Sequence, residues 1–294
     1  MKVGIYGQYY KGEAISYIEI LLESLSIKNS KIVIEEKFYC LIKKSLTSNR
    51  EYKTFNSYLD LDNSFDVLLT VGGDGTFLRA VTYVRDLNIP LLGINIGRLG
   101  FLATVQKEHI SEAIDLLFTK QYKVNERSVL TVSTNKKNDD LSDINFALNG
   151  ISVSRRNTTS MITVKTYLDD EYLTSYWADG LIVSTPTGST GYSLSCGGPV
   201  ITPSTKSLVL TPIAPHNLNA RPLVIPDDTV IKLKVDSREK QSLLSLDSKI
   251  TTVENNTEVL IQKASFTIKI MQLNKQTFLK TLREKLLWGE DKRN

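Results

Sequence analysis

The sequence predicts a Rossmann-like α/β domain with a parallel sheet, followed by a β-rich, sandwich-like domain. Up to about residue 121, buried-strand segments alternate with segments of helical periodicity, which is typical of a parallel sheet with helices on its faces. From residue 122 the pattern changes to that of short strands. A chain of 294 residues is long enough for two hydrophobic cores. We therefore place domains at 1–121 and 122–273, with a C-terminal segment at 274–294 whose helix returns to the first domain.

The N-terminal domain is expected to begin on a strand and to alternate with helices. Ile15, Ile18 and Leu25 are spaced as on one face of a helix. The expected elements are a strand at 3–6, a helix at 13–25, a strand at 31–35, a helix at 37–46, an irregular stretch at 47–64, a strand at 67–71, a helix ending near Asp86, a strand at 91–96 and a helix at 107–120.

The second domain is expected to consist mainly of strands joined by turns. Asp169, Asp170 and Glu171 form a polar break between two of them, as in a hairpin turn. Residues 136–143 form a polar, exposed loop. The expected strands lie at 128–133, 144–153, 162–167, 172–177, 181–184, 207–212, 229–235, 258–262 and 265–271, and the final helix lies at 276–287.

Composition limits the partners. The formal net charge is +4 and no stripe of clustered Lys and Arg is present, so nucleic acid is not an expected partner. No apolar run approaches the roughly 20 residues of a membrane span, and the N-terminus has no signal-peptide pattern, so we expect a cytoplasmic protein without a membrane partner. Of the two cysteines, Cys40 lies in an apolar-periodic segment and is expected to be a buried small hydrophobe.

The stretch around Gly72-Gly73-Asp74-Gly75 is the first that carries chemistry. It follows a buried strand, and Thr76 suits the cap of the next helix. A tight glycine turn before a helix exposes backbone N–H groups at the positive end of the helix dipole, where phosphate binds. The alternative is an ordinary Asp/Gly turn. Asp74 is unusual in a phosphate cradle, and a carboxylate there indicates metal binding or proton abstraction.

The second informative stretch is a loop rich in hydroxyl groups and glycine at residues 184–192. Eight of its nine residues are Ser, Thr, Gly or Pro, and the ninth is Tyr192. Such a density of hydroxyls and free backbone groups suits sugar hydroxyls, an adenine edge or phosphate oxygens, and Tyr192 can stack on a base. A merely structural loop is the alternative, but the buried-looking strand segments on both sides favour a binding loop.

Several further residues have both a structural and a functional interpretation. Asn149-Gly150 ends an apolar strand and is either a hairpin turn, which the sequence favours, or a ligand contact. The glycine-rich loop at 97–101 ends another strand and favours a site shared with the first loop, because ligands sit at the carboxyl ends of such sheets. His216 is more often structural than catalytic in such a loop. Arg98 and Arg221 either meet phosphate or form ion pairs.

These motifs together resemble the NAD kinase family. The matching blocks, which follow one another in order along most of the chain, are Gly72-Gly73-Asp74-Gly75-Thr76, residues 97–102, Ala147-Leu148-Asn149, Asp179-Gly180, the loop at 184–192, residues 211–216 and Asn219-Ala220-Arg221-Pro222. The first block is shared with lipid kinases and phosphofructokinases, whereas the loop ending in Tyr192 is more specific.

The resemblance implies transfer of the γ-phosphate of ATP to the 2′-hydroxyl of the adenosine ribose of NAD, at a site between the two domains of a homodimer or homotetramer. It implies that Asp74 is the catalytic base and that a divalent cation, Mg²⁺, arrives with ATP rather than on dedicated metal ligands. The residues implied to face phosphate are Gly72, Gly73, Gly75 and Thr76. The residues implied to bind NAD are Asn149, Gly150, Asp179, Ser189, Thr190, Gly191, Tyr192 and Ala214.

The sequence departs from the family pattern at Gly150, where an acidic residue normally follows the asparagine. That side chain is expected to grip ribose hydroxyls, and the loss of one charge-assisted hydrogen bond costs about 1.5–3 kcal/mol. One hypothesis is therefore a catalytically weakened NAD-binding protein of the same fold. A lipid or sugar kinase is another alternative, although it would lack the loop ending in Tyr192. A dehydrogenase is disfavoured, because no Gly-x-Gly-x-x-Gly turn follows the first strand.

Overall fold

A computed structural model describes residues 1–8, 14–157, 160–274 and 276–287. The chain folds into two compact units. Unit 1 combines Met1–Glu126 with the chain from Ile268 onward, and unit 2 is Arg127–Thr267. The domain bounds predicted from the sequence differ from this division by a few residues at each break and stay a prediction. Two long strands, β7 (Tyr122–Thr134) and β18 (Glu258–Leu273), each contribute residues to both units.

Unit 1 is built on a parallel sheet, which confirms the α/β prediction. Its strand order is β3-β2-β1-β4-β5, followed by the end of β18, and every pairing is parallel. The elements of unit 1 are β1 (Lys2–Gly7), α1 (Ala14–Ile27), β2 (Lys31–Glu35), α2 (Glu36–Ile42), β3 (Lys53–Phe55), β4 (Val67–Val71), α3 (Asp74–Val84), β5 (Leu91–Asn95), β6 (Val105–Gln106), α4 (Ile110–Phe118) and α6 (Phe278–Leu286).

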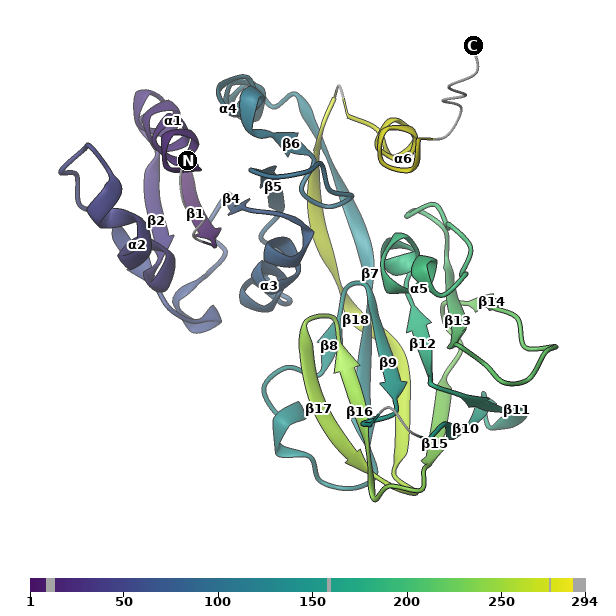
Figure 1. The fold of residues 1–294 in the computed structure, drawn as a ribbon. Helices are drawn as coiled ribbons and strands as arrows, with labels where there is room; N and C mark the ends of the chain where they lie inside the picture. The colour runs from purple at the N-terminus through teal and green to yellow at the C-terminus, as the bar shows by residue number, and fades with distance from the viewer. Residues whose placement is uncertain (9–13, 158–159, 275, 288–294) are drawn as a thin grey trace, which may run out of the picture. The chain divides into compact units, whose positions relative to one another are not determined.

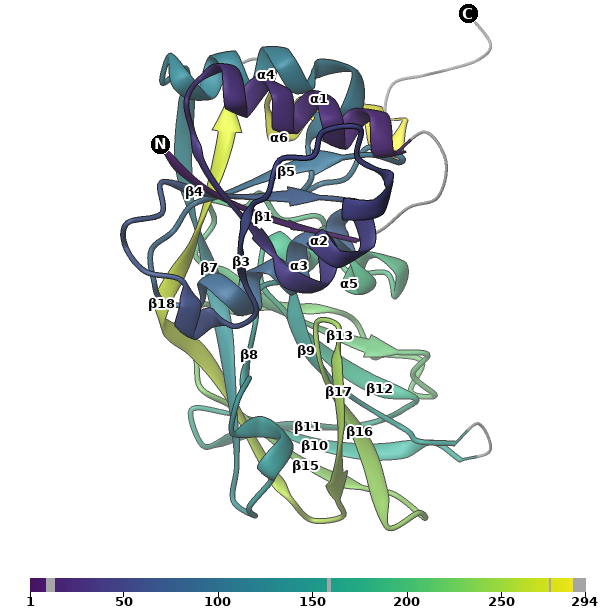
Figure 2. The same ribbon diagram turned by 90° about the vertical axis from the view of Figure 1, so that its left-hand side faces the viewer.

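Successive side chains of each strand in unit 1 point to opposite faces of the sheet, and different helices cover the two faces. Val3 and Ile5 of β1 belong to the same core cluster as the buried faces of α1 and α4. Tyr6, on the opposite face, packs against Tyr83 of α3, with ring centroids 5.1 Å apart. Helices α1 and α4 lie side by side over one face, and α3 lies over the other (Figure 2). Strand β4 therefore leads straight into α3 at the carboxyl edge of the sheet.

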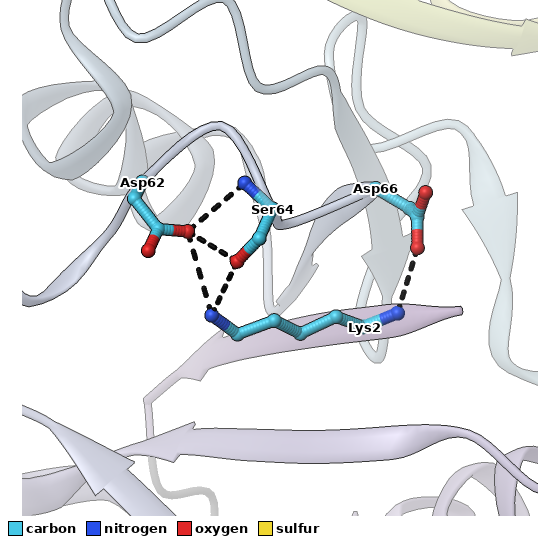
Figure 3. A network of polar contacts seen from close by, with 4 residues as sticks. All are labelled: Lys2, Asp62, Ser64 and Asp66. Atoms are coloured by element: carbon cyan, nitrogen blue, oxygen red, sulfur yellow. Dashed lines mark hydrogen bonds and ion pairs between the residues drawn. The ribbon is translucent and has the colours of Figure 1, made fainter.

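The opposite edge of this sheet is fixed by polar contacts around Lys2 (Figure 3). The Lys2 backbone N–H donates to Asp66 Oδ2 over 2.7 Å, just before β4 begins. Its ammonium group donates to Ser64 Oγ over 2.7 Å and to Asp62 Oδ1 over 3.4 Å. These bonds link the start of β1 to the segment that leads into β4. They supplement the backbone pairing of β1 with β4. The carboxyl ends of these two strands lie at the other edge of the sheet.

Unit 2 is a sandwich of antiparallel sheets, as predicted. One sheet has the order β14-β13-β12-β9-β16-β17, and the other contains β11-β10-β15-β18, with β7 beside β18. Side chains from both sheets form one buried cluster. The remaining strands are β8 (Phe146–Ala147), β9 (Gly150–Ser154), β10 (Ile162–Leu168), β11 (Glu171–Ala178), β12 (Gly180–Ser184), β13 (Ser207–Ile213), β14 (Leu223–Pro226), β15 (Ile231–Asp236), β16 (Gln241–Leu246) and β17 (Lys249–Glu254). The short helix α5 is Tyr192–Ser195.

The structure corrects several local predictions. The expected strand at 144–153 is interrupted at Leu148-Asn149, the two expected strands at 258–262 and 265–271 are one strand, and β14, β16 and β17 were not predicted. Helix α3 begins at Asp74 with Gly73 as its N-cap, so Thr76 is inside the helix and is not the cap. Cys40 is exposed, because α2 buries Phe38, Tyr39 and Ile42 instead. Within the described residues, no helix combines the length and apolarity of a membrane span.

Candidate functional site

The glycine turn after β4 presents free backbone donors at the start of α3. Gly72 has φ +151°, and a side chain there would overlap Thr76, so the turn requires glycine. The backbone N–H groups of Gly73, Asp74 and Gly75 donate to no group within the described residues. Three free donors at the positive end of an 11-residue helix suit phosphate oxygens.

Thr76 stabilises the glycine turn from a buried position in the first turn of α3. Its side chain is buried, and its hydroxyl donates to Gln8 Oε1 over 3.2 Å. The backbone N–H of Gln8 in turn donates to the carbonyl oxygen of Val71. Thr76 thus ties the start of α3 to the end of β1. In this position it supports the backbone of the glycine turn rather than presenting a free hydroxyl.

The carboxylate of Asp74 is held by the loop that follows β5. Oδ2 accepts the N–H of Phe101 at 2.8 Å, and Oδ1 accepts those of Leu102 and Ala103 at 3.0 and 2.9 Å. A Cβ at Gly100 would overlap Oδ1, so this approach requires a glycine. A carboxylate has about four acceptor positions. Three are used by these N–H groups, and one remains open.

The loop after β5 was predicted to share a site with the first loop, and the structure brings the two into direct contact through Asp74. Arg98 is exposed, and its carbonyl oxygen accepts the side-chain N–H of Asn95 over 2.6 Å. The described residues contain no group of three or more His, Cys, Asp or Glu side chains arranged to hold a metal ion. The free N–H groups at Gly73–Gly75 do fit phosphate oxygens that carry their own cation, as a magnesium complex of ATP does.

In unit 2, Asn149 lies in a turn whose backbone is fully engaged. Its carbonyl oxygen accepts the N–H of Thr185 at 2.9 Å and the hydroxyls of Thr185 and Ser184, both at 3.2 Å. A side chain at Gly188 would overlap that same carbonyl oxygen. The side-chain amide of Asn149 has no hydrogen-bond partner within the described residues and is half-buried. An unpaired amide on a fixed turn is suited to bind a ligand.

Gly150 lies where β9 passes β12 closely. A Cβ at this position would lie 2.7 Å from the carbonyl oxygen of Val183 and 3.2 Å from the Cα of Ser184. Both are backbone atoms of a central strand, so they move only if the sheet is distorted. The glycine that departs from the family pattern therefore has a packing role in this chain.

Gly150→Ala is expected to lower the free energy of unfolding by about 1–3 kcal/mol, because the methyl group overpacks the β9–β12 contact. Gly75→Ala is the matched control, since nothing lies within 4 Å of a Cβ at Gly75 in the first turn of α3. That variant is expected to be as stable as the wild type or slightly more stable. Urea denaturation of both variants measures the difference. Equal stabilities would contradict the close approach.

The loop after β12 is braced by its own hydroxyl groups. Ser189 is fully buried; its hydroxyl donates to the carbonyl oxygen of Pro186 at 2.7 Å and accepts the N–H of Ile201 at 2.9 Å. The Thr190 hydroxyl donates to the carbonyl oxygen of Thr187 over 3.3 Å. Both residues were predicted to contact adenosine. The structure shows them supporting the loop, and their ligand contacts stay a prediction.

One predicted residue, Gly191, lies beside the free amide of Asn149, and a second, Tyr192, follows it in the chain. A Cβ at Gly191 would lie 3.5 Å from Asn149 Nδ2, which places this glycine beside the amide. Tyr192 follows directly, and its side chain is 58% exposed. Partial burial raises the pKa of the Tyr192 hydroxyl, with further contributions from Cys196 and from the negative charge of Asp179. Tyr192 therefore stays a neutral donor next to an open surface.

Asp179 and Ala214 are brought together by the pairing of β12 with β13. The N–H of Asp179 donates to the carbonyl oxygen of Ile213 at 2.9 Å, and Ala214 follows with φ +42° and an exposed side chain. Asp179 forms an ion pair with Arg155, with 2.8 Å between Oδ2 and Nη2. Arg155 was not predicted from the sequence, since nothing in its surroundings distinguishes it from other surface arginines.

Two other residues near this region have structural roles. The N–H of His216 donates to the carbonyl oxygen of Trp177 at 2.8 Å, and the two rings pack with centroids 4.4 Å apart. Arg221 donates to the carbonyl oxygens of Leu218 and Ala220 at 2.7 and 2.9 Å, which favours the structural interpretation of that side chain.

Thr187 is a candidate that the sequence did not single out from its loop. Only 8% of the residue is exposed, and its hydroxyl has no partner within the described residues. A buried hydroxyl without a partner is unfavourable unless a ligand or water completes it. The sequence shows that Thr187 belongs to a hydroxyl-rich loop, but it does not show that this hydroxyl is buried without a hydrogen-bond partner.

Comparison with known proteins agrees with this arrangement. Residues 3–122 match the ATP-NAD kinase N-terminal domain, and residues 148–273 match the ATP-NAD kinase C-terminal domain. The chain is 59% identical to the NAD kinase of Christiangramia forsetii and 55% identical to that of Flavobacterium psychrophilum, each over 294 residues and the full length of both chains.

Two solved structures share the fold. The crystal structure of yeast NADH kinase complexed with NADH has a TM-score of 0.87 at 26% identity, covering 99% of this chain and 89% of that one. An NAD kinase from Archaeoglobus fulgidus in complex with ATP has a TM-score of 0.77 at 24% identity, covering 98% and 99%. The domain matches and the full-length identities show that this chain belongs to the NAD kinase family, whose members are phosphotransferases with an alcohol group as acceptor.

Proposed function

We propose that this member of the NAD kinase family transfers the γ-phosphate of ATP to the 2′-hydroxyl of the adenosine ribose of NAD, with Asp74 as the proton acceptor. The observation that carries the assignment is the position of Asp74. Its carboxylate is held by three N–H groups, has one acceptor position left, and belongs to a turn with three free phosphate-facing donors. A proton acceptor and a phosphate cradle in one turn are what phosphoryl transfer to a hydroxyl requires.

In the proposed reaction the 2′-oxygen forms a bond to the γ-phosphorus while the bond from that phosphorus to the ADP oxygen breaks. The hydroxyl proton passes to Asp74. Gly72, Gly73, Gly75 and Thr76 form the phosphate-facing turn, which holds the transferred group through backbone N–H groups. Magnesium bound to ATP would neutralise charge on the phosphate oxygens.

Unit 2 is proposed to supply the residues for NAD. The free amide of Asn149 and the exposed ring of Tyr192 are suited to the adenosine, as a hydrogen-bonding group and a stacking surface respectively. Ser189, Thr190, Gly191, Asp179 and the backbone at Ala214 complete the proposed set, with Gly150 as the closely packed residue beside Asn149. The relatives named above support the nucleotides: one solved structure holds NADH and another holds ATP.

A second candidate is a catalytically weakened NAD-binding protein, and Gly150 is the observation in its favour. No side chain at this position can grip a ribose hydroxyl. Adding the acid does not test this hypothesis cleanly, because a side chain would collide with the backbone of β12. A direct measurement of turnover does.

The purified chain is expected to form NADP from NAD and ATP in the presence of Mg²⁺, and an excess of EDTA is expected to abolish the reaction. NADP formation is measured with a coupled dehydrogenase that accepts only NADP. NADH in place of NAD and polyphosphate in place of ATP define the acceptor and the donor. Binding of NAD without formation of NADP would reject the kinase assignment in favour of the weakened protein.

The family resemblance also leads us to propose a cytoplasmic homodimer or homotetramer. Light scattering after size-exclusion chromatography measures the mass of the assembly. Fractionation of cells that express the native chain measures its location.

A further inference from the structure

A carboxylate outside the proposed set lies against the turn that carries Asn149. Asp247 Oδ2 accepts the N–H of Leu148 at 2.8 Å, and Oδ1 accepts the N–H groups of Asn149 and Gly150, both at 3.0 Å. The N–H of Asp247 donates back to the carbonyl oxygen of Gly150 at 3.2 Å. All three donors of the turn therefore converge on one side chain that is about 100 residues away in the sequence.

We propose that Asp247 is a positioning residue for NAD binding, which acts by fixing the Leu148–Gly150 turn and so aiming the side-chain amide of Asn149. The inference rests on the proposed role of Asn149. In this account Asp247 acts on the turn and not on the substrate. It therefore does not replace the acidic side chain that position 150 lacks.

The turn is held from two sides, and this is why the amide of Asn149 has a fixed direction. Asp247 takes the N–H groups on one side, and Ser184 and Thr185 donate to its carbonyl oxygens on the other. With the backbone groups of Asn149 engaged on both sides, the side-chain amide is the group left for a ligand. Loss of the Asp247 side chain would release one side only and would leave the Thr185 side intact.

The chain places Asp247 with some backbone strain. Asp247 and Ser248 form the two-residue turn between β16 and β17, and Asp247 has φ +50°, in the left-handed region. Aspartate is among the residues that tolerate this conformation, which nevertheless costs free energy for any residue with a side chain. A glycine would satisfy the hairpin equally well. The carboxylate at this position is thus not explained by the hairpin and is explained by the turn that it holds.

Three converging N–H groups require a group that only accepts hydrogen bonds. An ionised carboxylate meets this requirement, whereas a protonated acid or an amide brings hydrogens toward the same donors. Burial raises the pKa of Asp247 to about 6, against the lowering effect of the three N–H donors, and no other ionisable side chain contributes. Lys249, the nearest basic residue in the sequence, donates to the carbonyl oxygens of Asp140 and Ile144 instead. Above about pH 6 the carboxylate is ionised and the turn is fully held.

The test is Asp247→Asn, compared with Asp227→Asn as the matched control. Asp227 is a buried aspartate of unit 2, and it pairs with Lys263 at 2.6 Å without a hydrogen bond to the turn. Asp247→Asn is expected to raise the KM and the Kd for NAD by about tenfold, the effect of losing one hydrogen bond to a charged group, with the KM for ATP unchanged. Asp227→Asn is expected to lower Tm without changing either KM. An unchanged KM for NAD in Asp247→Asn, or equal increases for NAD and ATP, would overturn the proposal.

A double substitution checks the route of the effect. If Asp247 acts through Asn149, adding Asp247→Asn to Asn149→Ala raises the Kd for NAD no further than Asn149→Ala alone. Full additivity of the two substitutions would show that the route through Asn149 is wrong.

The pH dependence keeps the proposal testable even if Asp247→Asn does not fold. In the wild type, the Kd for NAD is expected to increase as the pH falls through about 6, and this increase is expected to be absent from Asn149→Ala. Its persistence in Asn149→Ala would overturn the proposal. These Kd values are measured at equilibrium with NAD alone and require no turnover. If the wild type binds NAD but forms no NADP, the proposed function is rejected, and the Kd values still decide the role of Asp247.

Discussion

Asp74→Asn is expected to lower kcat by about 10²- to 10⁴-fold, the range for loss of a general base, while the Kd for NAD stays within about twofold of the wild type. The amide oxygen can take the place of Oδ1 and keep the N–H groups of Leu102 and Ala103 as donors. Two of the three hydrogen bonds that hold the side chain are therefore kept, whereas the N–H of Phe101 loses its acceptor, and the side chain can no longer accept the proton of the ribose hydroxyl. Calorimetric titration with NAD and the coupled assay for NADP measure the two effects separately.

Asp66→Asn is the matched control for this experiment. Asp66 precedes β4, whereas Asp74 follows it, and Oδ2 of Asp66 accepts the backbone N–H of Lys2 at 2.7 Å (Figure 3). The same change of charge at the other end of the strand is expected to leave kcat unchanged. Turnover retained by Asp74→Asn would reject the role of Asp74 as base, and equal losses in both variants would point to an effect on folding.

Gly100→Ala is expected to lower kcat by about 10- to 100-fold, because displacement of a catalytic group by about 1 Å has an effect of this size. A methyl group on residue 100 would overlap Oδ1 of Asp74. Either the carboxylate rotates away or the N–H groups of residues 101–103 withdraw, and in both cases the base loses its place. The kcat is measured under saturating NAD and ATP, with the Kd for NAD as the measure of intact binding.

Gly97→Ala is the control within the same loop. A Cβ at Gly97 would lie 3.7 Å from Oδ1 of Asn95, an ordinary contact, and its φ is not in the left-handed region. This variant is expected to keep the wild-type kcat. If Gly100→Ala also kept it, the loop after β5 would have no part in holding Asp74.

The sequence was most informative where local pattern and fold coincide. The apolar run of β4, the glycines that end it and the helix after them were all predicted, because burial on both faces of a parallel strand leaves a continuous aliphatic segment. The start of α3 was misplaced by three residues, since an aspartate in the first helical turn can begin a helix without a side-chain cap. Cys40 was misplaced because α2 is shorter than predicted and turns its aromatic residues inward.

Strands β16 and β17 escaped prediction for a different reason. Their sequences mix Leu, Ile and Val with Ser and Thr without a regular apolar/polar alternation, and the turn between them is Asp247-Ser248 rather than a glycine turn. The hydrogen bonds that hold Asp74 and those that Asp247 accepts could not be predicted from the sequence either. Asp74 meets residues 27–29 positions away, and Asp247 meets residues 97–99 positions away. Periodicity describes the face of one element, and it carries no information about which distant loop that face meets.

The hydrogen bond from Gly150 to Asp247 also bears on the chemical lifetime of the protein. In an Asn-Gly pair the glycine nitrogen can attack the asparagine side-chain carbon, which expels ammonia, forms a succinimide and later leaves aspartate or isoaspartate. Glycine after asparagine leaves that nitrogen unshielded. Here the nitrogen of Gly150 is engaged by Oδ1 of Asp247 at 3.0 Å in a turn that is held on both sides. The contact that positions the amide of Asn149 thus also opposes its deamidation. In the unfolded chain this protection is lost, and deamidation is expected to begin at this Asn-Gly pair.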